Sequence, residues 1–178
     1  MSWFDSNYPP PRYDGDAGEV SASFRPADTP SDLVTPTGGR TDYLATKSLT
    51  GGDFGLYRVR MAPEAAGTST HFHKTVSESF YVMSGTLRVF DGDSWFTASA
   101  GDFFHVPAGG LHSFGNESGA PVDFLMLFTP GAAREGYFEG VRHLADLTDE
   151  ERTAFFIEHD SYFTDMVRGP AAERWRSR

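Results

Sequence analysis

Three histidines and one glutamate are spaced so that their side chains could surround one metal ion: His71, His73, Glu78 and His112. Because side chains alternate across a strand, His71 and His73 would point to the same face of an extended segment. Glu78 follows His73 by five residues, which is the wrong parity for one continuous strand. Residues 74–77 must therefore turn the chain, so that Glu78 begins the next strand and faces the same interior.

The donor types limit which cofactor such a site could hold. Three imidazoles and one carboxylate suit Fe(II), Ni(II), Mn(II), Co(II), Cu(II) or Zn(II), and without thiolates nothing selects among these ions. The chain has no cysteine, which excludes thiolate ligands and a disulfide framework. Four protein ligands would leave coordination positions open for catalysis. We therefore expect one divalent transition metal as the cofactor.

The segment that carries these residues resembles both sequence motifs of the cupin superfamily. The pattern H-x-H-x4-E-x6-G begins at His71, and the pattern G-x5-P-x-G-x2-H-x3-N begins at Gly101. The resemblance covers about residues 45–130. It departs from the family at one position, because the opening glycine of the first motif is replaced by Ala65, with Gly67 two residues later. That glycine serves a turn, so the departure leaves the ligand positions unchanged.

The resemblance implies an all-β fold, the jelly-roll barrel or double-stranded β-helix of cupins, with a metal near its middle. In that fold the metal ligands would be His71, His73, Glu78 and His112. The chain is similar to bacterial quercetinase-like dioxygenases, which implies a metal-dependent oxidoreductase that acts on a small aromatic or enolisable substrate and O2. Glu78 would also be catalytic, as the base that takes the substrate proton, provided that it lies within hydrogen-bond reach of the substrate oxygen.

Two other classes of function stay open. A non-redox cupin would use its metal as a Lewis acid in an isomerase, cyclase or lyase. A ligand-binding cupin would keep the same residues without turnover. Each histidine taken alone could also be a core residue, since a single histidine on an apolar strand is more often a core residue than a ligand.

The substrate pocket is predicted from strand parity. Phe80 would share a face with Glu78, and Phe114 would share a face with His112, so we expect both phenylalanines to line the cavity. Such a lining would suit an aromatic or otherwise apolar substrate. His105 falls on no motif position, and we expect it outside the ligand set.

The elements that must position these residues follow from the hydrophobic pattern. Short apolar runs separated by glycine-containing turns favour a barrel or sandwich over βαβ units. The strands are expected at residues 55–61, 79–83, 86–90, 95–98, 103–106 and 122–128. The Asp91–Gly92 pair predicts a hairpin turn after residue 90.

The two ends of the chain predict different structures. Residues 1–44 are rich in Pro, Gly, Asp and Ser and predict an extended or flexible arm. Residues 131–178 predict a helical extension to the barrel at 45–130. It would hold one helix at 132–144 and another that opens with a capping box at Thr148 and Glu151 and runs to about residue 159.

Composition narrows the partners. The 178 residues carry a formal net charge of −10, which argues against non-specific nucleic-acid binding. No apolar run approaches the ~18–20 residues that span a bilayer, and no segment at the start resembles a secretion signal. We therefore expect a cytoplasmic protein with a small-molecule substrate and no nucleic-acid or membrane partner. Open sheet edges and the arm predict a homodimer.

Overall fold

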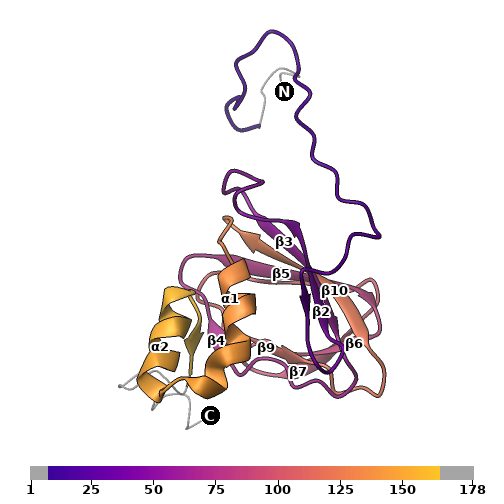
Figure 1. Cartoon of the computed structure of the whole chain (residues 1–178), viewed down its shortest axis with the longest axis vertical. Helices are drawn as coiled ribbons and strands as arrows, with labels where there is room; N and C mark the ends of the chain where they lie inside the picture. Colours follow the sequence, from indigo (N-terminus) through magenta and orange to yellow (C-terminus); the bar gives the residue numbers. More distant parts are fainter. Residues whose placement is uncertain (1–7, 165–178) are drawn as a thin grey trace, which may run out of the picture.

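The computed structural model describes residues 8–164, in which two antiparallel sheets face each other to form a barrel (Figure 1). The larger sheet has six strands, in the spatial order β1 (Leu33–Val34), β2 (Arg40–Ala45), β3 (Gly55–Met61), β10 (Val122–Thr129), β5 (Ser77–Ser84) and β8 (Phe103–Val106). The smaller sheet has three, β7 (Trp95–Ser99), β6 (Thr86–Phe90) and β9 (Ser113–Gly115). A separate pair joins β11 (Tyr162–Phe163) to β4 (His71–Phe72).

The core lies between the two sheets and is built from the inward faces of both. Its buried apolar side chains form one cluster that includes Tyr57, Phe80, Val82, Leu87, Val89, Phe114, Phe124 and Phe128. Burying each such side chain stabilises the fold by about 1.5–3 kcal/mol. The cluster therefore holds the sheets together and fixes which strand faces point inward.

The register of β5 confirms the parity argument made for Glu78. Glu78, Phe80 and Val82 are all buried, whereas Tyr81 on the opposite face is 45% exposed. Glu78 lies opposite Phe128 of β10 in the ladder. The inward face of β5 thus carries the glutamate into the barrel with core residues directly beside it.

The hairpin predicted after residue 90 is confirmed. Strands β6 and β7 pair antiparallel from Thr86 opposite Ser99 to Phe90 opposite Trp95. Gly92 in the connecting turn has φ +98°, a conformation in which a side chain would be strained.

The structure differs from the expected arm over residues 33–34 and 40–44, which lie in β1 and β2. Strand β2 pairs with β3, with Asp42 opposite Arg58 and Tyr43 opposite Tyr57. The ring of Tyr43 packs edge-on against Tyr57 with 5.7 Å between centroids, so this segment has a core contact of its own. The nearby prolines at 26, 30 and 36 all precede β2 and do not interrupt it.

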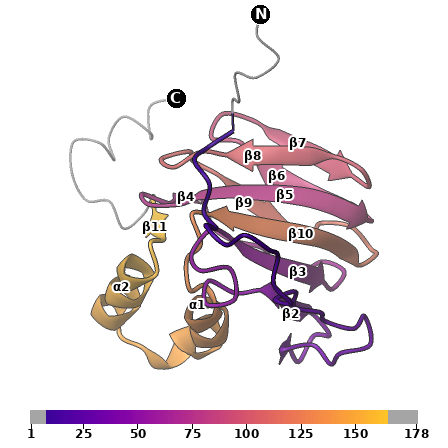
Figure 2. The ribbon, with the colours of Figure 1, turned by 90° about the horizontal axis from the view of Figure 1, so that it is seen from above.

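The helical extension forms at one end of the barrel, beside β4 and β11 (Figure 2). The helix expected at 132–144 is divided into α1 (Glu135–Gly140) and a 3₁₀ helix, η1 (Val141–Asp146). Helix α2 (Asp149–Glu158) opens with the predicted capping box between Thr148 and Glu151. Residues 165–178 of the expected extension lie outside the described residues. Among residues 8–164, no helix is long and apolar enough to cross a membrane.

Candidate metal centre

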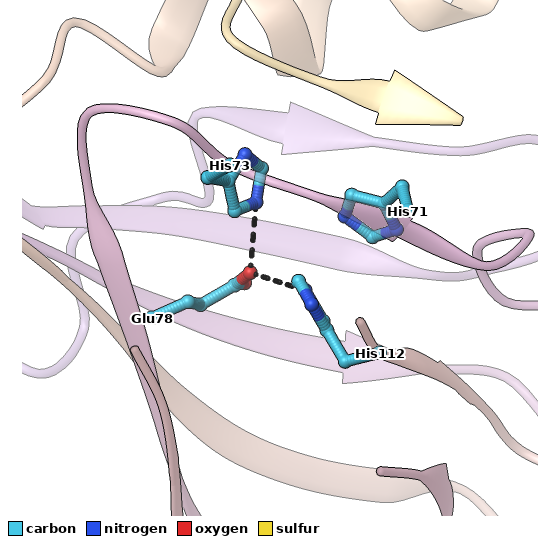
Figure 3. Close-up of side chains that lie close together, drawn as sticks. All are labelled: His71, His73, Glu78 and His112. Atoms are coloured by element: carbon cyan, nitrogen blue, oxygen red, sulfur yellow. Dashed lines mark hydrogen bonds and ion pairs between the residues drawn. The ribbon is translucent and has the colours of Figure 1, made fainter. Parts of the chain in front are cut away.

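The four residues that the sequence singled out come together inside the barrel (Figure 3). Each offers one ligand atom, and these atoms all lie within 4.8 Å of one another in the set His71, His73, Glu78 and His112. None of the four is more than 3% exposed. Bulk water is therefore largely excluded from the donors.

The four ligands come from three separate segments, two of which are joined by backbone hydrogen bonds. His71 lies in β4, and its main chain exchanges two hydrogen bonds with that of His112, at 3.0 and 2.9 Å. His73 follows β4 directly, and its carbonyl accepts from Gly109 N at 2.7 Å. Glu78 stands near the start of β5. The turn that precedes His112 is thus docked against the segment 71–73, which carries the other two histidines.

Hydrogen bonds to main-chain carbonyls place a proton on Nδ1 of all three rings. The Nδ1 atom lies 2.9 Å from the Ser69 carbonyl in His71, 2.5 Å from the Asp160 carbonyl in His73, and 3.1 Å from the Gly110 carbonyl in His112. A carbonyl oxygen can only accept, so Nδ1 must carry the proton in each ring. In the neutral rings this leaves a lone pair on Nε2, the arrangement typical of metal-binding histidines.

The contacts of Glu78 show that this donor set fits a cation. Its Oε2 lies 2.9 Å from His112 Nε2 and 3.1 Å from His73 Nε2. Because both Nδ1 atoms donate to carbonyls, each Nε2 faces the carboxylate with either a second proton or a bare lone pair. A divalent ion between these atoms would satisfy the carboxylate and the lone pairs together.

Electrostatics keep the carboxylate charged and at least one imidazole neutral. Burial, together with the neighbouring His112, lowers the pKa of His71 to about 3. Burial acts to raise the pKa of Glu78, but the hydrogen bonds from His112 and His73 outweigh it and hold that pKa well below its ordinary value. Burial acts to lower the pKa of His112, yet the contact with Glu78 outweighs it and raises that pKa.

A cavity of about 390 Å³ adjoins the four ligand residues, His71, His73, Glu78 and His112, which we call the tetrad. Its wall includes His71 and Glu78 and is otherwise mainly apolar, with the aromatic side chains of Phe114, Phe128, Tyr137, Phe138, Phe156 and Phe163. The helical extension supplies part of this wall, including Tyr137, Phe138 and Phe156. Its volume and lining suit a small apolar or aromatic molecule.

The two phenylalanines expected to line the pocket occupy different places. Phe114 lines the cavity. Phe80 is 1% exposed and stacks on Phe104 with 4.3 Å between ring centroids, so it belongs to the core and is not part of the cavity wall. His105 lies outside the tetrad, where its Nδ1 is 2.8 Å from Ser79 Oγ.

Sequence reasoning missed two residues beside the site, Arg134 and Asp160. Arg134 is 4% exposed and lines the cavity. The carboxylate of Asp160 accepts hydrogen bonds from the Lys74 and Thr75 amides, both at 2.9 Å. Both residues come from the extension, which follows the second motif, and neither has a spacing that could have indicated its place.

Comparisons with known proteins agree with this fold. Residues 57–128 match the family model described as Cupin domain. Among solved structures, KdgF from Halomonas sp. has a TM-score of 0.54 at 23% identity and covers 62% of this chain and 96% of its own. Ectoine synthase from P. lautus has a TM-score of 0.52 at 17% identity, with 64% of this chain and 78% of its own covered.

A third structure, described as a sugar phosphate isomerase from a cupin superfamily of Silicibacter pomeroyi, is 30% identical. Its TM-score is 0.46, and the match covers 51% of this chain and 59% of that one. No curated protein matches the chain. The family match and the first two structures together show that the fold is the cupin β-barrel.

Proposed function

We propose that this cupin-fold protein is a metal-dependent oxidoreductase, a quercetinase-like dioxygenase that acts on a small aromatic or enolisable substrate and O2. The observation that carries the proposal is the buried tetrad opening onto a cavity with an aromatic wall. The fold alone does not select this activity, because one fold hosts many reactions.

One divalent transition metal would be held by the tetrad His71, His73, Glu78 and His112. When bound, it supplies Lewis acidity toward a hydroxyl or enolate oxygen of the substrate. The carbonyls that hold each Nδ1 keep the imidazoles oriented toward that ion before the substrate arrives.

The other tasks fall to residues of the cavity wall. The charged carboxylate of Glu78 would take the acidic proton of the substrate, which activates the carbon for attack on O2. Phe114 and Phe128 would hold a planar substrate and keep water from the reacting carbon. Both oxygen atoms enter the products in a dioxygenation, so the reaction needs no external reductant.

Oxygen uptake tests this proposal directly. Protein loaded in turn with Fe(II), Ni(II), Mn(II), Co(II), Cu(II) or Zn(II) would be mixed with flavonols and other enolisable aromatics at an oxygen electrode. We expect uptake with at least one metal and a loss of about 100-fold in Glu78→Gln, the usual size for a catalytic base. Tyr81→Phe is the matched control, because Tyr81 lies on the same strand and points outward.

Three outcomes would contradict parts of the proposal. Unchanged uptake in Glu78→Gln at equal metal content would remove the base role. Turnover that persists under strict anaerobiosis would assign the protein to a non-redox class such as isomerases, cyclases or lyases. Ligand binding without turnover, unaffected by metal removal, would make it a binding protein.

A further inference from the structure

The guanidinium of Arg134 lies in the wall of the cavity that also contains Glu78. Arg134 is 4% exposed, and its guanidinium carbon lies 4.1 Å from the ring centre of Tyr137 and 5.0 Å from that of Phe128. Phe128 is the residue opposite Glu78 in the β5–β10 ladder. The positive charge is therefore enclosed by aromatic rings next to the tetrad.

The hydrogen bonds of Arg134 leave one side of the guanidinium with spare donors. Nη1 donates to the carbonyl of His159 and lies 3.4 Å from Ser161 Oγ. Nη2 has only the same hydroxyl, also at 3.4 Å. Nε is buried and has no hydrogen-bond partner among the described residues. Since a guanidinium has five N–H donors, Nη2 still has an N–H to offer an acceptor.

Arg58 shows how this chain uses the same side of a guanidinium elsewhere. Its Nε lies 2.9 Å from Asp123 Oδ1 and its Nη2 lies 2.6 Å from Asp123 Oδ2. Arg134 has no such partner, because within residues 8–164 it forms no ion pair with any carboxylate. The missing partner would be an anion.

The charge balance of the cavity also calls for an anion. An arginine side chain stays protonated inside proteins, and an enclosed charge is unfavourable unless it is paired. Glu78 supplies the strongest nearby negative charge. A divalent ion in the tetrad would take Glu78 as its ligand, and that one carboxylate neutralises only half of the ion's charge. The loaded cavity would then be positive at both the tetrad and Arg134.

We propose that Arg134 binds the carboxylate of an acidic substrate through Nη2, while the aromatic wall takes the apolar body of the same molecule. The inference rests on the proposed function, because it names the substrate class of that cavity: an aromatic or apolar carboxylic acid. Bound in this way, the acid would present its reactive hydroxyl or carbon toward the tetrad.

Arg134 also has a structural contact that the test must separate from anion binding. Its Nη1 atom ties the start of α1 to the turn at His159–Ser161. That contact uses no carboxylate and leaves Nε without a partner. A purely structural arginine would affect folding but would not make the protein prefer an acid over its neutral amide.

Calorimetry on Zn(II)-loaded protein tests the proposal without turnover. The probes are 2-naphthoate and its neutral counterpart 2-naphthamide. Wild type is expected to bind the acid about 10- to 100-fold more tightly than the amide, the range of hydrogen bonds to charged groups. In Arg134→Met the ratio is expected to fall about 10-fold, because only the charge at the tetrad then favours the acid. Arg142→Met, at an exposed position of η1, should keep the wild-type ratio.

Two results would overturn the proposal. Equal affinity for acid and amide in wild type would show that the cavity does not select an anion. An unchanged ratio in Arg134→Met would show that the metal alone holds the acid.

If circular dichroism shows Arg134→Met to be unfolded, Arg134→Lys decides. A lysine keeps the charge but lacks the planar guanidinium that presents Nη2, so the ratio should fall about 5-fold or more, and an unchanged ratio would refute the role of Arg134. The calorimetric assay measures binding alone, so an absence of oxygen uptake would contradict only the dioxygenase proposal.

Discussion

Asp160 connects the end of the described chain to the loop that carries His73. Its carbonyl lies 2.5 Å from His73 Nδ1. Its carboxylate accepts from the Lys74 and Thr75 amides at 2.9 Å and from the Thr75 hydroxyl at 2.6 Å. Asp160, whose φ is +52°, thus holds both the ring of His73 and the turn that leads to Glu78.

Asp160→Ala is therefore expected to weaken metal binding. Loss of the carboxylate frees the turn after His73, and residues that orient metal ligands typically contribute 10- to 100-fold in metal affinity. We expect about a 10-fold rise in the Kd for Zn(II) and about 1–2 kcal/mol lower stability. Competition with a chromogenic chelator measures the first, and urea denaturation measures the second. Asp146→Ala, at an exposed position, is the control, and an unchanged Kd in Asp160→Ala would refute the role.

At this scale the sequence predicted the tetrad but not its neighbours. The alternation of side chains and the two motifs were enough to predict that four side chains point into the barrel interior: His71, His73, Glu78 and His112. Arg134 and Asp160 could not be found, because their position depends on how the extension packs back onto the barrel. A single arginine or aspartate in a helical tail has no spacing that reveals such a contact.

Strands β3 and β10 are joined by a charged cluster as well as by their ladder. Asp123 lies within hydrogen-bond distance of Arg58 and Arg60, at 2.6 and 2.9 Å for the closest atoms. Burial acts to raise the pKa of Asp123, but the hydrogen bonds from the two arginines outweigh it and lower that pKa. The folded state therefore stabilises the charged form of Asp123 more than the unfolded state does.

This shift gives a pH-dependent contribution to stability. Because the pKa of Asp123 is lower in the folded state, its contribution is present above the unfolded value of about 3.9 and is lost as the pH falls through the folded value. Asp123→Asn should lower the free energy of unfolding at neutral pH by about 1–2 kcal/mol, since both arginines are partly exposed. Urea denaturation should show this difference shrinking below pH ~4. A difference that is independent of pH would contradict the argument, and Asp28→Asn is the exposed control.

Gly67 allows the segment before β4 to pass directly over β9. A Cβ at this position would lie 1.4 Å from the Phe114 carbonyl oxygen, which is main chain and cannot rotate away. Gly67→Ala should therefore lower the free energy of unfolding by about 3 kcal/mol or more and displace the cavity wall at Phe114. Thermal denaturation measures the effect. Gly119→Ala has open space around its Cβ and should be near neutral, and equal melting temperatures for the two variants would contradict this account.

Some of the strands could be predicted from the local sequence pattern alone. Strands β3, β6 and β8 have the expected bounds, because their apolar runs end at turn residues. Strand β2 was missed because its place in the sheet depends on pairing with β3, which local composition does not reveal. The expected helix at 132–144 ends early as an α-helix because its last turns tighten into η1.

At the scale of the whole molecule, the end of the described chain closes over the site. Strand β11 pairs with β4, and Phe163 stacks on the His71 ring with 5.1 Å between centroids. The barrel and the extension thus meet at the ligand-bearing strand (Figure 1). A metal ion held there would couple both parts of the chain, so its binding should stabilise the whole fold.

Homodimerisation and a cytoplasmic location remain predictions. The larger sheet has β1 and β8 at its edges, and an open edge can pair with a second copy of the chain. Light scattering at micromolar concentration is expected to give the mass of a dimer, and a monomer mass would contradict this expectation.

The most direct test of the account is the metal content of the purified protein. Elemental analysis of wild type is expected to find about one equivalent of a divalent transition metal per chain, since the four donors form a single site. His112→Ala removes one ligand and should lose the metal, while His105→Ala lies outside the tetrad and should retain it. A wild type that binds no metal even after reconstitution would contradict the metal centre and the proposed activity with it.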